Sequence, residues 1–469
     1  MQTSTPIIDL HVHSTLKPYG NSFYGTDYRS STESSCLWFS DYRDRRDVVV
    51  EGLFGICRYR QSDFRTLTDA QVKIAFVSLY PIEKQFFNIS KRSLRPLEVI
   101  IAEFASMFGK KRIQFIRDSQ YNYFKDLCSE YMYLCALNRV LTESRKYELP
   151  KNADYLDSDA NLLVIPSIEG CHAFCDGGDP MNEQQWGNME ENVKTVKMWE
   201  SPPLFVTFAH HFYNGLCTHA KSLFDMAGNL LDQEYGMRDK GFTPFDKEDP
   251  IHKERGHKMI SLLLSRENGR RILIDVKHMS LDARKEYYKK IEIEYSNDIP
   301  PVVWSHGAVA YDNEEINMHL DIDVKMIYKT KGIIGIEMDQ RILGYNKNRF
   351  WKAIKRFFRR RNRAYEDAGY FFTQIITIAE FAYKEKIFYN SPWECIALGS
   401  DYDGIINPLN SYPDAISLSL LYDHLISYLN EYWQSSRAVI PQMPGEDAAD
   451  VIFNIMYRNA YNFIVTNYR

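Results

Sequence analysis

The sequence predicts an α/β protein, a (β/α)8 TIM barrel with long insertions. Two observations lead to this fold class. Short apolar runs rich in β-branched residues occur eight times along the 469 residues, and helix-like stretches separate them. The runs are continuously apolar rather than alternating, which is typical of parallel strands covered on both faces. Eight such units indicate a closed barrel, because a doubly wound sheet does not need so many.

The first half of the chain supplies four of the expected strands. The run at 7–11 is short and rich in isoleucine, and the runs at 72–79 and 162–168 are largely valine, isoleucine, leucine and phenylalanine. The run at 204–210 is similar and is followed directly by a second histidine. Between the second and third strands, apolar residues recur at helical spacing over 97–108, which predicts a helix there.

The second half supplies the other four strands, at 271–278, 302–306, 332–337 and 396–401. Helical spacing of apolar residues predicts helices at 257–265 and 371–383, before the fifth and the eighth strand. The stretch at 445–463 is expected to close the barrel as a helix. Its predicted core contacts are Val451, Ile455, Ala460 and Phe463.

We expect a single domain over residues 1–469, because no linker, internal repeat or low-complexity segment interrupts the chain. A run of six basic residues at 355–363 could contact phosphates, but one such run in a protein of net charge −5 favours a solvated helix face. The insertions that decorate the barrel are predicted at about 15–70, 110–155, 213–256 and 340–394.

Composition narrows the functional classes. Hydrophobic residues make up 45% of the chain and charged residues 25%, as in soluble globular proteins. The 57 basic and 62 acidic residues give no field that would attract nucleic acid, so a small-molecule partner is expected. No stretch approaches the length of a membrane span, and no secretory signal precedes the first apolar run. We expect a cytoplasmic protein with eight reduced cysteines, and a homodimer is possible.

A His-x-His pair follows the first apolar run. In a strand, residues two apart point to the same side, so His11 and His13 should project together, with Asp9 on that side as well. Two imidazoles side by side suit a divalent metal such as zinc. A surface pair or two hydrogen-bonded core histidines would explain the motif equally simply. The residues at the ends of the other strands are therefore needed to distinguish a metal site from a structural histidine pair.

Polar side chains end six of the eight predicted strands. In a barrel the carboxyl ends of all strands meet at one rim, where the active site is built. Buried polar groups need partners, so a purely structural explanation for six such ends is costly. The residues concerned are His11, His13, Glu169, His172, His210, His211, Asp275, His278, His306 and Asp401.

Part of this set is sufficient for two metal ions that share one site. Four histidines and a carboxylate would serve as metal ligands: His11, His13, Glu169, His278 and His306. The two oxygens of Glu169 would let it bridge the ions, with a bound hydroxide as the second bridge and the nucleophile. Asp401 would carry the proton from the nucleophile to the leaving group. His210 and His211 are expected to support the site or the core.

These motifs resemble the amidohydrolase superfamily and, within it, the membrane dipeptidase (renal dipeptidase, peptidase M19) family. The similar fragments are "IPSIEG", "GFTPFD", "LIDVKHMS", "PPVVWSHGAV" and "ALGSDYDG", in that order along most of the chain. The resemblance implies that His11, Glu169, His278 and His306 hold metal and that Asp401 is the acid–base group. It also implies that His172 stabilises the oxyanion during hydrolysis of an amide or peptide-like bond.

The chain departs from that family at three places, one of which is Lys277, where the family usually has a serine. The family usually has an aspartate where this chain has His13. The His-x-His pair of this chain is the form found in the wider superfamily. The stretch after His306 lacks the arginine by which the family holds the free carboxylate of a dipeptide. The resemblance therefore implies a metal-dependent hydrolase of amide-like bonds without fixing a dipeptide as the substrate.

Three alternatives remain open at this stage. A PHP-type phosphoesterase would share "DLHVHS", but no Asp-His pair follows in "KIAFVSLYPIE". A lactonase-like amidohydrolase would use the same metals on an ester, usually with a carboxylated lysine where this chain has Glu169. A barrel that has lost catalysis and acts as a binding protein is the third, and metal content separates it from the enzymes.

Overall fold

The computed structural model describes residues 5–22, 35–41, 43, 47, 57–87, 107–137, 145–223, 250–310, 314–344 and 363–469. All eight predicted strands are present, most of them shorter than predicted. They are β1 (Ile7–Val12), β2 (Val72–Leu79), β4 (Leu162–Glu169), β5 (Phe205–Thr207), β6 (Leu273–Asp275), β7 (Val303–Trp304), β8 (Ile333–Ile336) and β9 (Ile396–Leu398). Every residue of these strands except Lys73 is buried, as the continuously apolar runs predicted.

The strands form one parallel sheet in the order β2-β1-β9-β8-β7-β6-β5-β4-β3. Strand β2 also pairs with β4, which closes eight strands into the predicted (β/α)8 barrel. The register pairs Asp9 with Leu398, and Thr207 with both Glu169 and Asp275. The ninth strand, β3 (Tyr147–Glu148), was not predicted, because two residues are too short to give a periodic signal.

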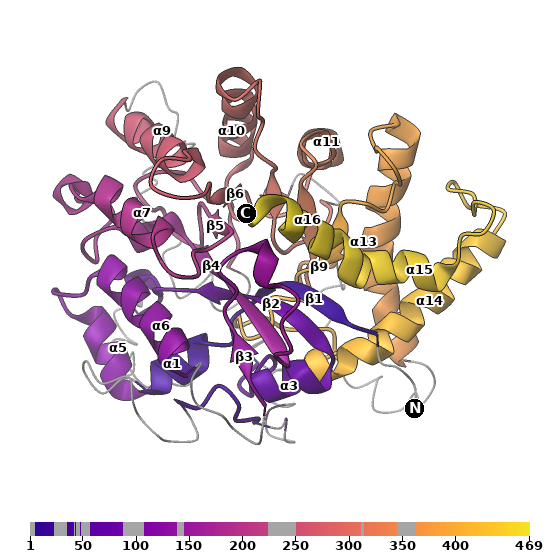
Figure 1. Cartoon of the computed structure of the whole chain (residues 1–469), viewed down its shortest axis with the longest axis horizontal. Coiled ribbons are helices and arrows are strands. Elements are labelled where there is room, and N and C mark those ends of the chain that lie inside the picture. The colour runs from indigo at the N-terminus through magenta and orange to yellow at the C-terminus, as the bar shows by residue number, and fades with distance from the viewer. Residues whose placement is uncertain are drawn as a thin grey trace, which may run out of the picture. The chain divides into compact units, whose positions relative to one another are not determined.

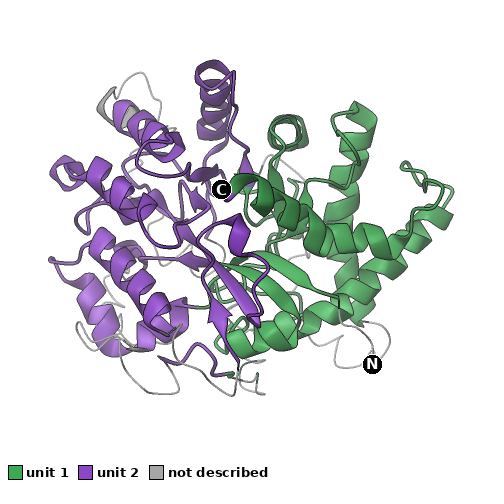
Figure 2. Ribbon diagram, in the orientation of Figure 1, with its two compact units in different colours: residues 1–14, 40–76, 304–467 green, residues 15–39, 77–303, 468–469 purple. Residues whose placement is uncertain are grey.

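The chain divides into two compact units, coloured separately in Figure 2. Unit 1 comprises residues 1–14, 40–76 and 304–467, and unit 2 comprises residues 15–39, 77–303 and 468–469. The divisions fall inside β2 and β7, so each of these strands contributes to both units. The single-domain organisation stays a prediction.

In the described part of unit 1, long helices follow the last two strands (Figure 1). The predicted helix at 371–383 is the centre of α13, and Phe371, Ile375 and Ile378 on one face of it are buried. The predicted closing helix is confirmed as three consecutive helical segments, and its four predicted core residues are all buried. The helices are α3 (Phe64–Asp69), η7 (Leu320–Val324), α11 (Lys325–Lys329), α13 (Arg363–Glu385), η8 (Ala415–Ser417), α14 (Leu418–Gln434), α15 (Ala448–Phe453), η9 (Asn454–Arg458) and α16 (Asn459–Asn467).

In unit 2, α7, α9 and α10 lie outside strands β4 to β6 (Figure 1). The predicted helix at 257–265 is the second half of α9, whereas most of the one predicted at 97–108 lies outside the described residues. The described helices are α1 (Leu16–Ser22), η2 (Lys84–Phe87), α5 (Lys110–Arg117), α6 (Tyr123–Leu137), η4 (Ala153–Tyr155), η5 (Cys171–Phe174), η6 (Glu183–Trp186), α7 (Met189–Lys197), α9 (Pro250–Leu264) and α10 (Leu281–Glu294).

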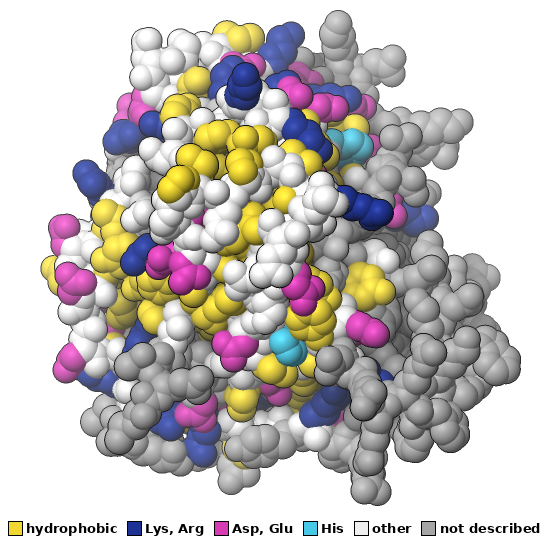
Figure 3. Space-filling model, turned by 90° about the vertical axis from the view of Figure 1, so that its right-hand side faces the viewer, with side chains coloured by type: hydrophobic (Ala, Val, Ile, Leu, Met, Phe, Trp, Pro, Cys, Tyr) yellow, Lys and Arg dark blue, Asp and Glu magenta, His cyan; other side chains and the backbone are white. Residues whose placement is uncertain are grey.

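Parts of all four predicted insertions lie outside the described residues, and so does the basic run at 355–363 apart from Arg363. No helix in the described part of the chain is long and apolar enough to cross a membrane. On the described part of the face in Figure 3, acidic and basic side chains are interspersed among apolar ones. The prediction that the protein does not bind nucleic acid stays untested.

Two glycines let β7, β8 and β9 approach one another closely. A Cβ atom at Gly335 or at Gly399 would lie 1.9 Å from the carbonyl oxygen of Ser305, far inside van der Waals contact. Both positions therefore have to be glycine for the segment after β7 to keep its path. That segment carries His306, so these two glycines help to fix the position of a candidate metal ligand.

A buried polar network joins α1, α5, α6 and the end of β2 within unit 2. Arg112 on α5 pairs with the Asp126 carboxylate on α6 through both of its terminal nitrogens. One turn further along α6, Glu130 accepts hydrogen bonds from the Thr15 hydroxyl at 2.6 Å and from the Tyr80 backbone N–H at 2.8 Å. Burial, with Asp126 nearby, raises the pKa of the Glu130 carboxyl to about 7.

Glu130 should make the stability of the protein depend on pH. The pKa of Glu130 in the folded state lies above its value in the unfolded state. The contribution of this group to the free energy of unfolding is therefore fully present below pH 4.5 and is lost as pH rises through 7. We expect this group to lower the free energy of unfolding by at most about 3 kcal/mol between pH 4.5 and 8. Denaturant unfolding of the wild type and of Glu130→Gln at pH 5 and pH 8 measures the effect. Equal pH slopes in the two proteins would contradict it.

Candidate metal centre

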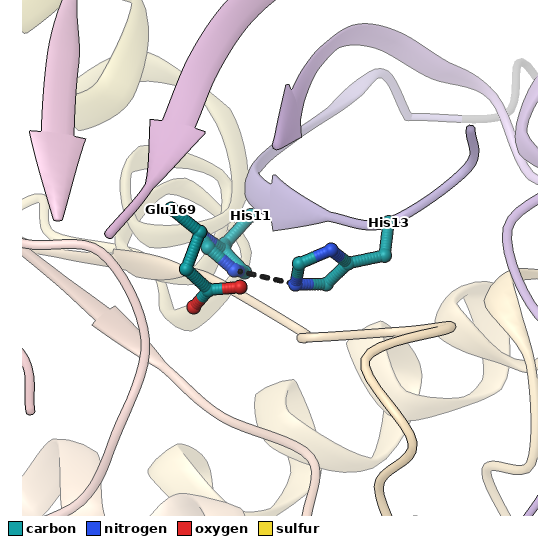
Figure 4. A group of neighbouring side chains, drawn as sticks. All are labelled: His11, His13 and Glu169. Atoms are coloured by element: carbon teal, nitrogen blue, oxygen red, sulfur yellow. Dashed lines mark hydrogen bonds between the residues drawn. The ribbon is translucent and has the colours of Figure 1, made fainter. Parts of the chain in front are cut away.

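Unit 1 brings together four of the predicted site residues, His11, His13, His306 and Asp401. His11 is on β1 and His13 directly follows it, and both side chains are buried. Their Nε2 atoms lie 3.1 Å apart, and a dashed line joins the two rings in Figure 4. Asp401 Oδ1 lies 3.7 Å from Nε2 of His11 and 3.4 Å from Nε2 of His13. Ligand atoms of His11, His306 and Asp401 all lie within 4.8 Å of one another.

These separations fit one divalent ion. Bonds of about 2.1 Å from a tetrahedral ion to nitrogen and oxygen place neighbouring donor atoms about 3.4 Å apart. The three distances among His11, His13 and Asp401, which are 3.1, 3.7 and 3.4 Å, lie close to that value. Imidazole nitrogen and carboxylate oxygen are also the donor types that zinc accepts. We call the four residues of this group the unit 1 cluster.

Backbone hydrogen bonds hold the unit 1 cluster in place. Asp9 Oδ1 accepts the N–H of His11 at 3.2 Å and that of Ser400 at 2.9 Å, so this carboxylate joins β1 to the segment after β9. The N–H of Asp401 donates to the carbonyl of His11 at 2.9 Å, and that of His13 donates to Tyr402 at 2.8 Å. The Asp9 carboxylate thus accepts hydrogen bonds from backbone N–H groups next to the cluster.

Asp403, the second aspartate of "SDYDG", binds the backbone of a neighbouring segment. Asp403 accepts hydrogen bonds from the backbone N–H groups of Gln61 and Ser62, at 3.2 and 2.9 Å, and from the Ser62 hydroxyl at 2.7 Å. It anchors the segment before α3. Gly404 follows it, and a Cβ atom there would lie 2.1 Å from Oδ1 of Asp401. The turn is therefore shaped around the Asp401 carboxylate.

Unit 2 brings together Glu169 and His278, two further predicted ligands, with His210. Glu169 is the last residue of β4, and the two histidines follow β5 and β6. Glu169 Oε1 lies 3.5 Å from Nε2 of His210 and 3.9 Å from Nε2 of His278. The donor atoms lie within 4.8 Å of one another, and all three side chains are buried. These three residues, the unit 2 cluster, also fit one divalent ion.

Only a supporting role is predicted for His210 from the sequence, although its position at the end of a predicted strand was the available signal. Glu83 was missed altogether. Its carboxylate, buried beyond β2, contacts Nδ1 of His210 at 2.9 Å and accepts a hydrogen bond from the Tyr80 hydroxyl. Burial alone would raise the pKa of Glu83, but His210, with His172 and His211 nearby, holds it below the ordinary value.

His172 belongs to neither cluster among the described residues. It lies on η5, and its Nε2 is 2.7 Å from the carbonyl oxygen of Pro81, so this nitrogen donates. Nδ1 could then donate to an oxyanion only if the ring were doubly protonated, and burial lowers the pKa of His172. Gly170 leaves room for the ring, because a Cβ there would lie 2.3 Å from it. The oxyanion role stays a prediction.

Comparison with known proteins identifies the fold. No protein-family model matches the sequence, and no curated protein sequence matches it significantly. Solved structures do match. A dipeptidase of metallopeptidase family M19 is 11% identical, with a TM-score of 0.50, and the match covers 99% of both chains. The chain has the fold of this metallopeptidase.

Two more solved structures match in the same way. A probable dipeptidase, PvdM, from Pseudomonas aeruginosa has a TM-score of 0.51 at 11% identity, over 98% of this chain and 95% of the other. A metallopeptidase from Rhodobacter sphaeroides, bound to a phosphinate mimic of L-Ala-D-Ala, has a TM-score of 0.50 at 12% identity, over 99% and 100%. The resemblance noted in the sequence motifs is thus confirmed at the level of the fold.

Proposed function

We propose that the protein is a binuclear metal-dependent hydrolase of amide or peptide-like bonds. The observation that carries the proposal is the pair of buried clusters, each with three donor atoms at the spacing of one divalent ion. Both clusters follow barrel strands at their carboxyl ends, which is where barrel enzymes build their active sites. The fold shared with an M19 dipeptidase, a probable dipeptidase and a further metallopeptidase supports the same reaction class.

The proposal includes two ions, with zinc as the expected metal and Glu169 as the carboxylate that bridges them. Ions held there would supply an activated water and polarise the scissile carbonyl. The carboxylate of Glu169 has two oxygens, and Oε1 lies 3.5 Å from Nε2 of His210 and 3.9 Å from Nε2 of His278. The substrate is a small molecule with an amide-like bond. A cytoplasmic location is part of the proposal, because a reducing compartment suits a chain with eight scattered cysteines.

Within this reaction Asp401 carries the proton. Its carboxylate lies beside Nε2 of His11 and of His13, and its side chain is only 11% exposed. A carboxylate in that position can accept a proton from the attacking water and return it to the leaving amine. His172 is proposed to stabilise the oxyanion, which requires the imidazolium form while Nε2 donates to Pro81.

Metal analysis tests the proposal. Protein purified without chelator is expected to hold about two ions per chain, and a His11→Ala, His13→Ala double variant should lose at least one of them together with activity. His424→Ala on α14, outside both clusters, serves as the control. Hydrolysis is then screened with dipeptides, N-acyl amino acids, lactones and phosphoesters. A wild-type protein that binds no ion after incubation with zinc or manganese would refute the proposal.

A further inference from the structure

The ring of His210 is held on several sides within unit 2. Its Nδ1 lies 2.9 and 3.2 Å from the two carboxylate oxygens of Glu83. The rings of Tyr80 and His278 pack edge-on against it, with centroids 4.7 Å away in both cases. Only 5% of His210 is exposed. The side chain therefore has a single orientation, and one nitrogen is committed to a carboxylate.

That contact fixes the tautomer. An ionised carboxylate only accepts hydrogen bonds, so Nδ1 of His210 carries the hydrogen that Glu83 receives. A neutral imidazole then has its lone pair at Nε2. This lone pair lies 3.5 Å from Oε1 of Glu169, at the separation of about 3.4 Å expected for two donors on one tetrahedral ion. Two electron-rich atoms in that arrangement are stabilised by a cation between them.

Glu83 is itself held firmly, which suits it to orient another residue. It is 3% exposed, and it also accepts the backbone N–H of His211 at 3.3 Å and the hydroxyl of Tyr80. A carboxylate that orients a histidine in this way raises the basicity of the other ring nitrogen and is typical of metal-bound histidines. Burying such a carboxylate without a function would be costly.

We propose that His210 is a third protein ligand of the ion in the unit 2 cluster, and that Glu83 is the residue that positions it. The inference rests on the proposed function, because it names ligands of the same metal centre. It adds His210 to the ligand set predicted from the sequence and gives Glu83 a role that no motif indicated. Glu83 acts through His210 and does not contact the substrate.

Metal affinity tests both residues in the full-length protein. His210→Ala and Glu83→Ala are expected to weaken binding of one zinc ion by about 10- to 100-fold, measured by competition with a chromogenic chelator, and to leave the other ion unchanged. Glu83→Gln should restore much of the affinity, because its amide oxygen can accept the hydrogen of Nδ1. His424→Ala on α14 removes an imidazole outside both clusters, so it is the matched control.

A second measurement separates ligation from a structural role. Replacing zinc with cobalt gives visible absorption bands that report the ligand set, and His210→Ala should change them whereas His424→Ala should not. Unchanged zinc affinity and cobalt spectra in folded His210→Ala and Glu83→Ala would overturn the inference and leave the hydrolase proposal intact. Ion binding that depends on His210, in a protein that hydrolyses no amide, would sustain the inference and refute the proposed function.

Discussion

Replacing Asp401 with asparagine is expected to lower kcat by about 10²- to 10⁴-fold, while the protein stays folded and keeps its metal at saturating zinc. Asparagine has the shape of aspartate and retains one oxygen near His11 and His13. It cannot accept a proton at neutral pH, so transfer to the leaving amine would fail. Steady-state kinetics at saturating metal, with ion content and thermal unfolding of the same samples, measure the effect.

The neighbouring Asp403 provides a matched control for that experiment. Asp403→Asn makes the same chemical change two residues away, where the carboxylate anchors the backbone of Gln61 and Ser62. We expect it to lower thermal stability more than kcat. An Asp401→Asn protein that holds its ions and turns over at the wild-type rate would exclude the proton-transfer role. An equal loss of kcat in both variants would point to disruption of the turn.

Backbone geometry supports a functional role at this turn and at His278. Asp401 has φ of +60° and His278 has φ of +66°, both in the left-handed region that residues other than glycine seldom adopt. Such conformations cost free energy and concentrate at functional sites. One of these residues belongs to the unit 1 cluster and the other to the unit 2 cluster. Each strained turn aims a donor atom at its cluster.

The sequence predicted which of these side chains lie close together where two simple rules apply. Residues two apart in a strand share a side, which placed His11 beside His13, and parallel barrel strands carry functional groups at their carboxyl ends. The second rule also indicated Glu169, His278 and Asp401. Both rules use only the period of a strand and the direction of the sheet, so they need no knowledge of long-range contacts.

What the sequence did not predict depends on contacts between distant segments. Glu83 comes from the loop after β2 and meets His210, which lies 127 residues further along the chain. The partner of His172 is the backbone carbonyl of Pro81, and no side-chain pattern can reveal a backbone partner. The tautomer of His210 follows only from the first of these contacts. Such details require the folded chain.

Gly404 offers the most direct way to damage the unit 1 cluster without replacing any of its ligands. In Gly404→Ala the new Cβ would lie 2.1 Å from Oδ1 of Asp401 and 2.9 Å from Cδ2 of His13. Neither contact is tolerable, because carbon and oxygen atoms approach to roughly 3.4 Å. Asp401 and His13 would have to separate. The spacing that fits an ion would then be lost.

The backbone at Gly404 has no positive φ, so alanine meets no conformational penalty there and the fold should survive. We therefore expect Gly404→Ala to lose one ion and at least about 100-fold in kcat, with little change in thermal unfolding. Gly109→Ala is the control, since its Cβ would lie 3.7 Å from the nearest atom, an ordinary contact. Full ion content and wild-type turnover in Gly404→Ala would show that Asp401 and His13 need not be held together. The unit 1 cluster would then be a structural group, and catalysis would have to be sought elsewhere on the barrel.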